Sequence, residues 1–200
     1  MTRPRFCSEC GSALSDKAFQ GRGEILLCPH GHINLPPGPK ILVACFINCG
    51  EKLLWMKRGN PPRAGHWAIP AGFMENGESL REAAARELRE ETCVQIQPEQ
   101  LSPYMIGSID FISEVYLGFR ASVTSEHCGC GPESLDVGFF SEEEIDWDNV
   151  AYPSANAAVK TAYREARDNN FAIYHGNYTN SEDRLELAWR EPESIKPEDP

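Results

Sequence analysis

Residues 72–94 constrain this chain more than any other segment, because they gather acidic side chains on one short predicted helix. Ser79 and Glu82 have the spacing of a capping box, which predicts that the helix begins near Leu80. The glutamates on or beside this helix are Glu78, Glu82, Glu87, Glu90 and Glu91. So much negative charge on one short element needs a physical reason.

Three of these glutamates crowd the C-terminal end of the predicted helix. At about 100° per residue, Glu87, Glu90 and Glu91 fall within an arc of roughly 100°. The helix dipole is already negative there, and like charges three or four residues apart repel by a few tenths of a kcal/mol per pair. A bound Mg²⁺ would offset this repulsion, because Mg²⁺ prefers a few carboxylate oxygens with water and substrate phosphates. For the helix taken alone, the alternative is a solvated acidic face.

The spacing of the whole segment resembles the signature of the Nudix hydrolases, G-x5-E-x7-R-E-U-x-E-E-x-G-U, where U is a bulky aliphatic residue. Gly72, Glu78 and the run RELREE at residues 86–91 occupy the matching positions, and aliphatic residues fill both U positions. The match spans residues 72–94 with one departure, Cys93 where the family has glycine. So many fixed positions rarely coincide by chance, and the chain is identified as a member of this family.

The departure at Cys93 predicts a change in stability. The family glycine lies just past the helix, where a residue with positive φ is common. A cysteine that keeps this conformation is strained by about 1 kcal/mol. Alternatively, the loop has adjusted to the side chain. Neither outcome removes a carboxylate, so we expect the chemistry to be retained.

The resemblance implies Mg²⁺-dependent (or Mn²⁺-dependent) hydrolysis of a nucleoside diphosphate linked to a second group. It implies that Glu87, Glu90 and Glu91 hold the metal together with the carbonyl oxygen of Gly72. By the same analogy, Arg86 pairs with a glutamate of the signature and holds the preceding loop against the helix.

Four further residues are candidates for the site. Glu133, in a Gly-Pro-Glu loop, is the candidate that orients or deprotonates the attacking water, and a solvated loop acid is the alternative. Arg58 and Arg63 are candidates for phosphate contacts, although exposed charge explains either one alone. Trp67 is a candidate pocket residue, and core packing is the alternative because it lies in an apolar strand.

The N-terminal cysteines predict a small metal module. Cys7 and Cys10 form a C-x2-C knuckle, and Cys28 follows after seventeen intervening residues, which is the arrangement of a zinc ribbon. No cysteine stands three residues after Cys28, so His30 or His32 is expected to supply the fourth ligand of a structural Zn²⁺. A ribbon that has lost its metal is the alternative. The other cysteines show no metal-ligand spacing and are expected to be reduced thiols.

Composition bounds the remaining possibilities. With 41% hydrophobic residues, the chain has no apolar run approaching the roughly 18 residues of a membrane span. Its start, MTRPRFCSEC, lacks the apolar region of a signal peptide, so we expect a cytoplasmic protein. The net charge of −11 argues against nucleic acid as a partner. Lys and Arg outnumber Asp and Glu by nine to four in residues 1–71, and this excess of positive charge fits an anionic substrate beside the acidic helix. A solvated surface would explain the same charge asymmetry.

The chain is expected to contain a zinc-ribbon-like module at residues 1–35, a Nudix hydrolase domain at 36–180 and an acidic, mobile tail at 181–200. Apolar runs predict strands at residues 41–48, 52–57, 67–73, 104–109, 115–123 and 135–140. A second helix is expected at residues 156–168. These elements fit the α/β class, and the resemblance implies the Nudix α/β/α sandwich with a mixed sheet.

The resemblance extends to one Nudix subgroup, bacterial and plastid enzymes that act on FAD and ADP-ribose and release AMP. It rests on the ribbon-like start and on the segments HWAIPAGFMENGES and GPESLDVGFFSEEEIDWD. NADH pyrophosphatases also carry a zinc ribbon, but their S-Q-P-W-P-F-P segment is absent here. By analogy, a homodimer is expected. The alternatives are a degenerate Nudix domain that senses a nucleotide or binds a partner protein, or a different Nudix enzyme, either an NADH pyrophosphatase or a nucleoside triphosphatase.

Overall fold

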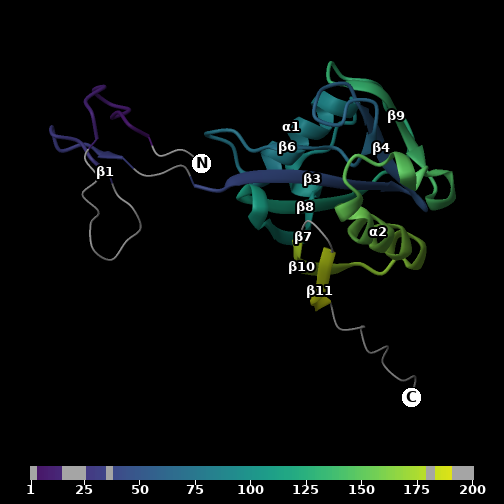
Figure 1. Cartoon of the computed structure of the whole chain (residues 1–200). Coiled ribbons are helices and arrows are strands. Elements are labelled where there is room, and N and C mark those ends of the chain that lie inside the picture. The colour runs from purple at the N-terminus through teal and green to yellow at the C-terminus, as the bar shows by residue number, and fades with distance from the viewer. Residues whose placement is uncertain (1–3, 15–25, 35–37, 179–182, 191–200) are drawn as a thin grey trace. The chain divides into compact units, whose positions relative to one another are not determined.

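The computed structural model describes residues 4–14, 26–34, 38–178 and 183–190. The chain divides into two compact units, Met1–Pro39 and Lys40–Pro200 (Figure 1). Residues 35–37, at the predicted boundary between the first two domains, and residues 191–200 of the predicted tail lie outside the described residues. None of the described helices is both long and apolar enough to cross a membrane.

The first unit is built from two tight turns and a short hairpin. The amide of Gly11 donates to the Cys7 carbonyl at 2.9 Å, and the amide of Gly31 donates to the Cys28 carbonyl at 2.9 Å. Strand β1 (Leu26–Leu27) pairs antiparallel with β2 (Ile33–Asn34). Each turn therefore reverses the chain directly after a cysteine.

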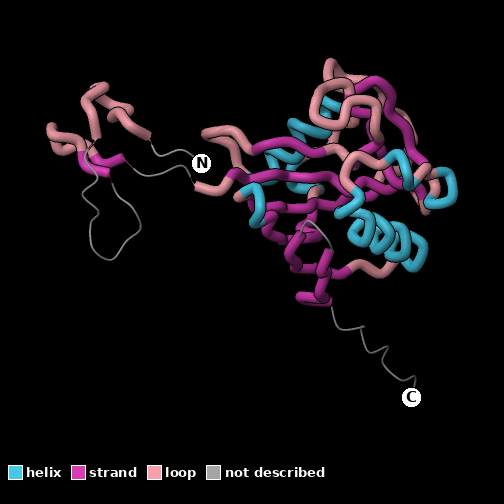
Figure 2. The backbone as a smooth tube through the Cα atoms, in the orientation of Figure 1, coloured by secondary structure: helices cyan, strands magenta, loops and turns pink. Residues whose placement is uncertain are grey.

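The second unit is built on one mixed sheet, drawn in magenta in Figure 2. Its strands are β3 (Lys40–Cys49), β4 (Lys52–Arg58), β5 (Trp67–Ala68), β6 (Ala71–Phe73), β7 (Ser102–Ile109), β8 (Glu114–Ser122), β9 (Ser134–Phe140), β10 (Ala172–Tyr178) and β11 (Asp183–Arg190). The order is β11-β10-β7-β8-β3-β4-β5, with β6 paired to β3 and β9 paired to β4. The β3–β8 and β7–β10 pairs are parallel, and the others are antiparallel.

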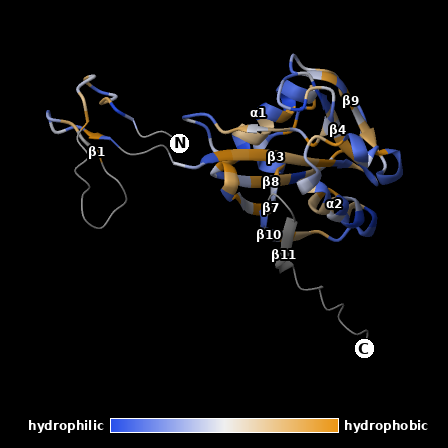
Figure 3. Ribbon diagram, in the orientation of Figure 1, coloured by the Kyte–Doolittle hydropathy of each residue, from blue (hydrophilic) through white to orange (hydrophobic). Residues whose placement is uncertain are grey.

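Two helices cover opposite faces of this sheet. They are α1 (Leu80–Thr92) and α2 (Asn156–Asp168), with short 3-10 turns η1 (Pro98–Gln100), η2 (Asp110–Ile112), η3 (Glu142–Glu144), η4 (Trp147–Asn149) and η5 (Pro153–Ala155). Strand β3 is apolar over most of its length because alternate side chains enter different cores (Figure 3). Val43 and Ile47 pack with Leu88 of α1, whereas Phe46 packs with Tyr163 of α2. The unit is therefore the expected α/β/α sandwich.

A buried hydrogen-bond relay fixes α2 to the sheet. The indole Nε1 of Trp55 donates to the Tyr163 hydroxyl at 2.8 Å, and that hydroxyl donates to the Phe140 carbonyl at 2.9 Å. Both aromatic side chains are fully buried, so satisfying their polar atoms avoids a desolvation cost of about 1–3 kcal/mol per group.

Two regions differ from the sequence-based prediction. The predicted strand at 67–73 is divided into β5 and β6, because Pro70 cannot donate to a ladder; its carbonyl accepts from the Cys45 amide at 2.9 Å. Residues 183–190, predicted to begin a mobile tail, instead form β11 against β10. Neither β10 nor β11 was predicted, although Leu185, Leu187 and Trp189 alternate with polar residues in β11.

The ends of α1 follow from its sequence. The Ser79 hydroxyl accepts from the Glu82 amide at 3.3 Å, and the Glu82 carboxylate accepts from the Ser79 amide at 2.7 Å, which confirms the capping box. At the other end, Cys93 has φ 57° and ψ 4°, and its amide donates to the Arg89 carbonyl at 3.0 Å. The cysteine therefore keeps the left-handed conformation that glycine adopts without strain.

Replacing Cys93 by glycine is expected to raise the free energy of unfolding by about 1 kcal/mol, because glycine has no Cβ penalty at positive φ. Chemical denaturation followed by tryptophan fluorescence measures this, since the chain's four tryptophans all lie in the second unit. Asn169→Gly at the left-handed C-cap of α2 is a matched control with a smaller expected gain, because asparagine tolerates this conformation. An unchanged or lower free energy of unfolding in Cys93→Gly would contradict the strain argument.

Candidate active site

The carboxylate of Glu91 is buried between α1 and β6. It is 5% exposed, and its Oε2 accepts a hydrogen bond from the Ala71 amide at 2.9 Å. Burial raises the pKa of Glu91 to about 8, the neighbouring charge of Glu87 adds to the rise, and the Ala71 amide opposes it. One hydrogen bond from a neutral amide does not neutralise a buried carboxylate, so a bound cation would stabilise the ionised form of Glu91.

Gly72 brings β6 into direct contact with Glu87. A Cβ on Gly72 would lie 2.1 Å from Cδ of Glu87 and 2.2 Å from both of its carboxylate oxygens. Any other residue at position 72 would displace this carboxylate. Burial also raises the pKa of Glu87, while the adjacent Arg86 opposes that shift.

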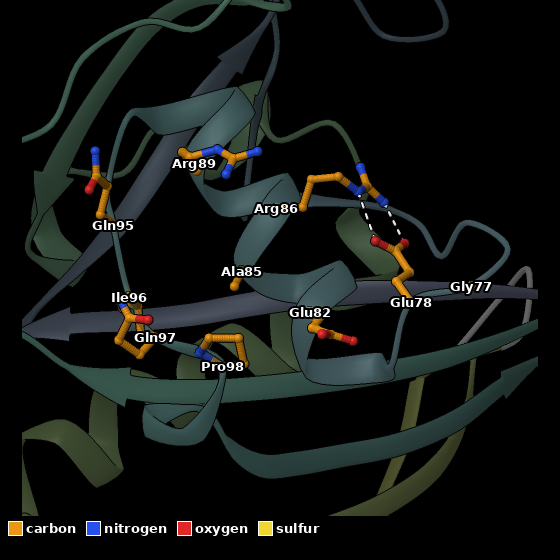
Figure 4. Close-up of a pocket in the computed structure, with 10 residues that line it drawn as sticks. All are labelled: Gly77, Glu78, Glu82, Ala85, Arg86, Arg89, Gln95, Ile96, Gln97 and Pro98. Carbon is orange, nitrogen blue, oxygen red and sulfur yellow. Dashed lines mark hydrogen bonds and ion pairs between the residues drawn. The ribbon is translucent and has the colours of Figure 1, made fainter.

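Arg86 ties the signature segment together, as expected. Its Nε and Nη2 donate to the two carboxylate oxygens of Glu78 at 3.0 and 2.7 Å, drawn as dashed lines in Figure 4. Its Nη2 also donates to the Phe73 carbonyl at 3.0 Å, and its Nη1 lies 2.8 Å from Glu87 and 3.3 Å from Glu90. The hydrogen bond from Arg86 lowers the pKa of Glu78. Arg86 thus positions the loop and two carboxylates of α1.

The loop that carries Glu133 docks on the last turn of α1. The Gly131 amide and the Ser134 hydroxyl both donate to the Glu91 carbonyl, at 3.1 and 2.6 Å. A Cβ on Gly131 would lie 1.6 Å from the Glu90 carbonyl oxygen, so the close approach requires glycine. Burial is the main cause of the raised pKa of both Glu87 and Glu91, and the negative charge of Glu133 adds to it. The docked loop therefore holds the exposed Glu133 beside the last turn of α1.

The three remaining candidates lie in different places. Arg58 is the last residue of β4 and lies on the same face of the strand as Leu54, which packs on the α1 side of the sheet. The positive charge of Arg58 opposes the rise in the pKa of Glu91 that burial causes. Arg63 is exposed in the loop between β4 and β5. Trp67 packs edge-on against Phe140, with centroids 5.0 Å apart, in the core on the α2 side. Core packing therefore accounts for Trp67, on the face opposite the carboxylates.

The sequence did not predict two groups, one that contacts a carboxylate of the site and one that contacts Arg58. The Ala71 main chain contacts Glu91, and its only signal was its position directly before Gly72. The ring of Tyr152 lies 5.7 Å from the guanidinium carbon of Arg58. No motif marks Tyr152, because it reaches this place through the packing of a segment far along the chain.

An open cavity of about 440 Å³ lies beside α1 (Figure 4). Its lining is Gly77, Glu78, Glu82, Ala85, Arg86, Arg89, Gln95, Ile96, Gln97 and Pro98. Of the signature's charged pattern it includes Glu78 and Arg86, and not Glu87, Glu90 or Glu91. Because the Glu78–Arg86 pair satisfies itself there, we assign no chemistry to this cavity.

The N-terminal unit gathers three thiols and one imidazole. The ligand atoms of Cys7, Cys10, Cys28 and His32 all lie within 4.8 Å of one another, with 3.3 Å between the Cys10 and Cys28 sulfurs. This Cys3His set is compatible with tetrahedral Zn²⁺, which binds sulfur at about 2.3 Å and imidazole nitrogen at about 2.0–2.1 Å. The ring of His30 is outside the set, so the structure selects His32 of the two candidate histidines.

Comparison with known proteins identifies the family. The NUDIX domain model matches residues 37–166, and the chain therefore belongs to the Nudix family. It is 38% identical to the uncharacterized Nudix hydrolase YvcI of Bacillus subtilis over 157 residues, covering 76% of this chain and 94% of that protein. The crystal structure of a NUDIX hydrolase from Nitrosomonas europaea matches with a TM-score of 0.78 and 33% identity, covering 88% of this chain and all of that one. The protein is a Nudix hydrolase.

Two relatives with named substrates match in part. The chain is 29% identical to the NAD-capped RNA hydrolase NudC of Stutzerimonas stutzeri over 138 residues, which are 68% of this chain and 47% of that protein. It is 44% identical to an ADP-ribose pyrophosphatase of Methanocaldococcus jannaschii over 54 residues, which are 27% of this chain and 32% of that protein. The chain thus spans half or less of these two relatives.

In metal-free protein, Glu91→Gln is expected to gain stability over the wild type as the pH rises from 5 to 8. The pKa of Glu91 is raised in the folded state, so ionisation favours the unfolded state across this window. The gain is on the order of 3 kcal/mol and is measured by denaturation of the second unit in the presence of a chelator. Glu90→Gln is the control, because Glu90 is 50% exposed. A difference between Glu91→Gln and wild type that does not change with pH would contradict the burial argument.

Proposed function

We propose that the protein hydrolyses the diphosphate bond of a nucleoside diphosphate linked to a second group, FAD or ADP-ribose, and releases AMP. The observation that carries this proposal is the direct contact of β6 with the carboxylates of Glu87 and Glu91. The loop of Glu133 docks on the Glu91 carbonyl, and Arg58 of β4 is paired with Ser134 at the end of that loop. The substrate class is supported by the subgroup resemblance of the sequence and by the partial similarity to an ADP-ribose pyrophosphatase.

Glu87, Glu90 and Glu91 are the proposed ligands of Mg²⁺ or Mn²⁺. The raised pKa values of the partly buried Glu87 and the buried Glu91 support this assignment, because a bound cation would stabilise the ionised form of both carboxylates. When bound, the metal supplies neutralisation of negative charge at the phosphate oxygens.

The geometry favours the carbonyl of Ala71 over that of Gly72 as the main-chain ligand. Within a strand, the N–H and C=O of one residue point to the same side, and the Ala71 amide points to Glu91. The Pro70 carbonyl and the Met74 amide bond to β3, so by alternation Gly72 also faces β3. In this proposal, Gly72 contributes the space that Glu87 occupies.

The chain's own groups then divide the remaining work. Glu133, whose carbonyl accepts from the Gly59 amide at 2.7 Å, is the proposed residue that orients or deprotonates the attacking water. Arg58, whose Nε donates to the Pro62 carbonyl at 3.1 Å, is the proposed phosphate contact. Arg63 stays a second candidate for this contact.

A NAD-type substrate is the second candidate, because the similarity to NudC extends over 68% of this chain. NAD shares a diphosphate that links adenosine to a second group, so the same carboxylates would serve it. A homodimer remains a proposal that rests on the family resemblance.

Product analysis tests the proposed reaction. With Mg²⁺, the purified protein is expected to release AMP from FAD or ADP-ribose, and Glu91→Gln is expected to reduce turnover by about 10³-fold or more while remaining folded. NADH and a nucleoside triphosphate serve as competing substrates in the same assay. Preferential cleavage of NADH would favour the second candidate. Binding of nucleotides with no cleavage of any of them would instead favour a nucleotide sensor.

We also propose that Cys7, Cys10, Cys28 and His32 hold a structural Zn²⁺. Burial raises the pKa of Cys7, but hydrogen bonds from Asn34 and from backbone amides outweigh it and lower the pKa to about 6. The Nδ2 of Asn34 lies 3.4 Å from the Cys7 sulfur, which supports a thiolate there.

Metal analysis of protein purified without chelator is expected to find about one zinc per chain, since four ligands complete one tetrahedral site. His32→Ala is expected to lose this zinc, whereas His30→Ala is expected to retain it because the His30 ring is outside the Cys3His set. Equal zinc contents in the two variants would overturn the choice of His32.

A further inference from the structure

Tyr152 presents an aromatic ring at the surface from a fixed backbone. It is 43% exposed, and the preceding Ala151 is buried with Met56 and Ala68. The Ala151 amide donates to the Trp67 carbonyl at 2.8 Å, which attaches this segment to β5. Burying the Tyr152 ring would remove apolar area from water. The fold instead buries Ala151 and leaves the Tyr152 ring at the surface.

The exposed ring adjoins the candidate active site. The guanidinium carbon of Arg58 lies 5.7 Å from the ring centroid. Arg58 is paired with Ser134 of β9, whose hydroxyl donates to the Glu91 carbonyl at 2.6 Å. Met56 and Arg58 lie on the same face of β4, and Met56 packs with Ala151. The Tyr152 ring, the Arg58 guanidinium and the carboxylates of α1 therefore follow one another in this order.

This order matches the chemical order of a nucleotide. A nucleobase stacks on an aromatic face, a guanidinium binds a phosphate, and a metal-binding carboxylate cluster acts at the diphosphate.

We propose that Tyr152 stacks on the nucleobase of the substrate, which is adenine in FAD and ADP-ribose, and with Arg58 sets its orientation. This inference rests on the proposed function, because it deepens the description of the same site. Stacking needs the ring and not the hydroxyl, so phenylalanine at this position would serve as well. The competing view is that Tyr152 only covers the Arg58 side chain at the surface.

Binding of AMP in the presence of Mg²⁺ tests the proposal without turnover, because AMP contains no diphosphate bond. Calorimetry would compare AMP with ribose 5-phosphate, which lacks the base, for the wild type, Tyr152→Ala and Tyr152→Phe. The wild type is expected to prefer AMP. Tyr152→Ala is expected to weaken AMP binding by about tenfold with ribose 5-phosphate unchanged, and Tyr152→Phe is expected to match the wild type.

Phe111→Ala is the matched control, because Phe111 is also an exposed aromatic residue, at 50%, but lies in the turn that joins β7 and β8. It should leave both affinities unchanged. The proposal is overturned if Tyr152→Ala binds AMP as tightly as the wild type, if it loses both ligands equally, or if the wild type shows no preference for AMP. A preference for AMP that depends on Tyr152, without cleavage of FAD or ADP-ribose, would support stacking while refuting the hydrolysis.

Discussion

The second unit depends on the close contact between strand β6 and helix α1. Gly72 lies directly against the carboxylate of Glu87, and the Ala71 amide donates to the buried carboxylate of Glu91. Arg86 closes the same contact from outside by binding Glu78 and the Phe73 carbonyl. The contact buries negative charge that the fold itself does not neutralise fully, which is why the pKa values of Glu87 and Glu91 are raised. That unsatisfied charge is the physical basis of the proposed metal site.

Stability and function make different demands at the end of α1. Cys93 adopts a left-handed conformation that costs about 1 kcal/mol, yet it leaves the preceding carboxylates in place. The Glu133 loop docks on the same helix turn through the Glu91 carbonyl. A residue can therefore replace the family glycine at a cost in stability, provided that the turn keeps its backbone path.

Local patterns in the sequence predicted the elements that position the site. The capping box of Ser79 and Glu82 set the start of α1, and the spacing of the glutamates placed three of them on one face. Nonlocal packing could not be predicted in this way. The side of the sheet on which Trp67 packs depends on where Pro70 divides the strand. Tyr152 lies beside Arg58 only because a segment far along the chain packs on β5. The fourth ligand of the cysteine cluster was ambiguous for the same reason, because only the folded turn separates His32 from His30.

The carboxylates that α1 holds against β6 are expected to form a site for a divalent cation. Titration with Mn²⁺, followed by electron paramagnetic resonance, measures this binding directly. Wild-type protein is expected to bind Mn²⁺, and Glu87→Gln is expected to lose at least tenfold in affinity. Glu82→Gln is expected to keep the wild-type affinity, because Glu82 serves the helix cap. Equal Mn²⁺ affinity in the wild type and Glu87→Gln would show that these carboxylates do not form the metal site.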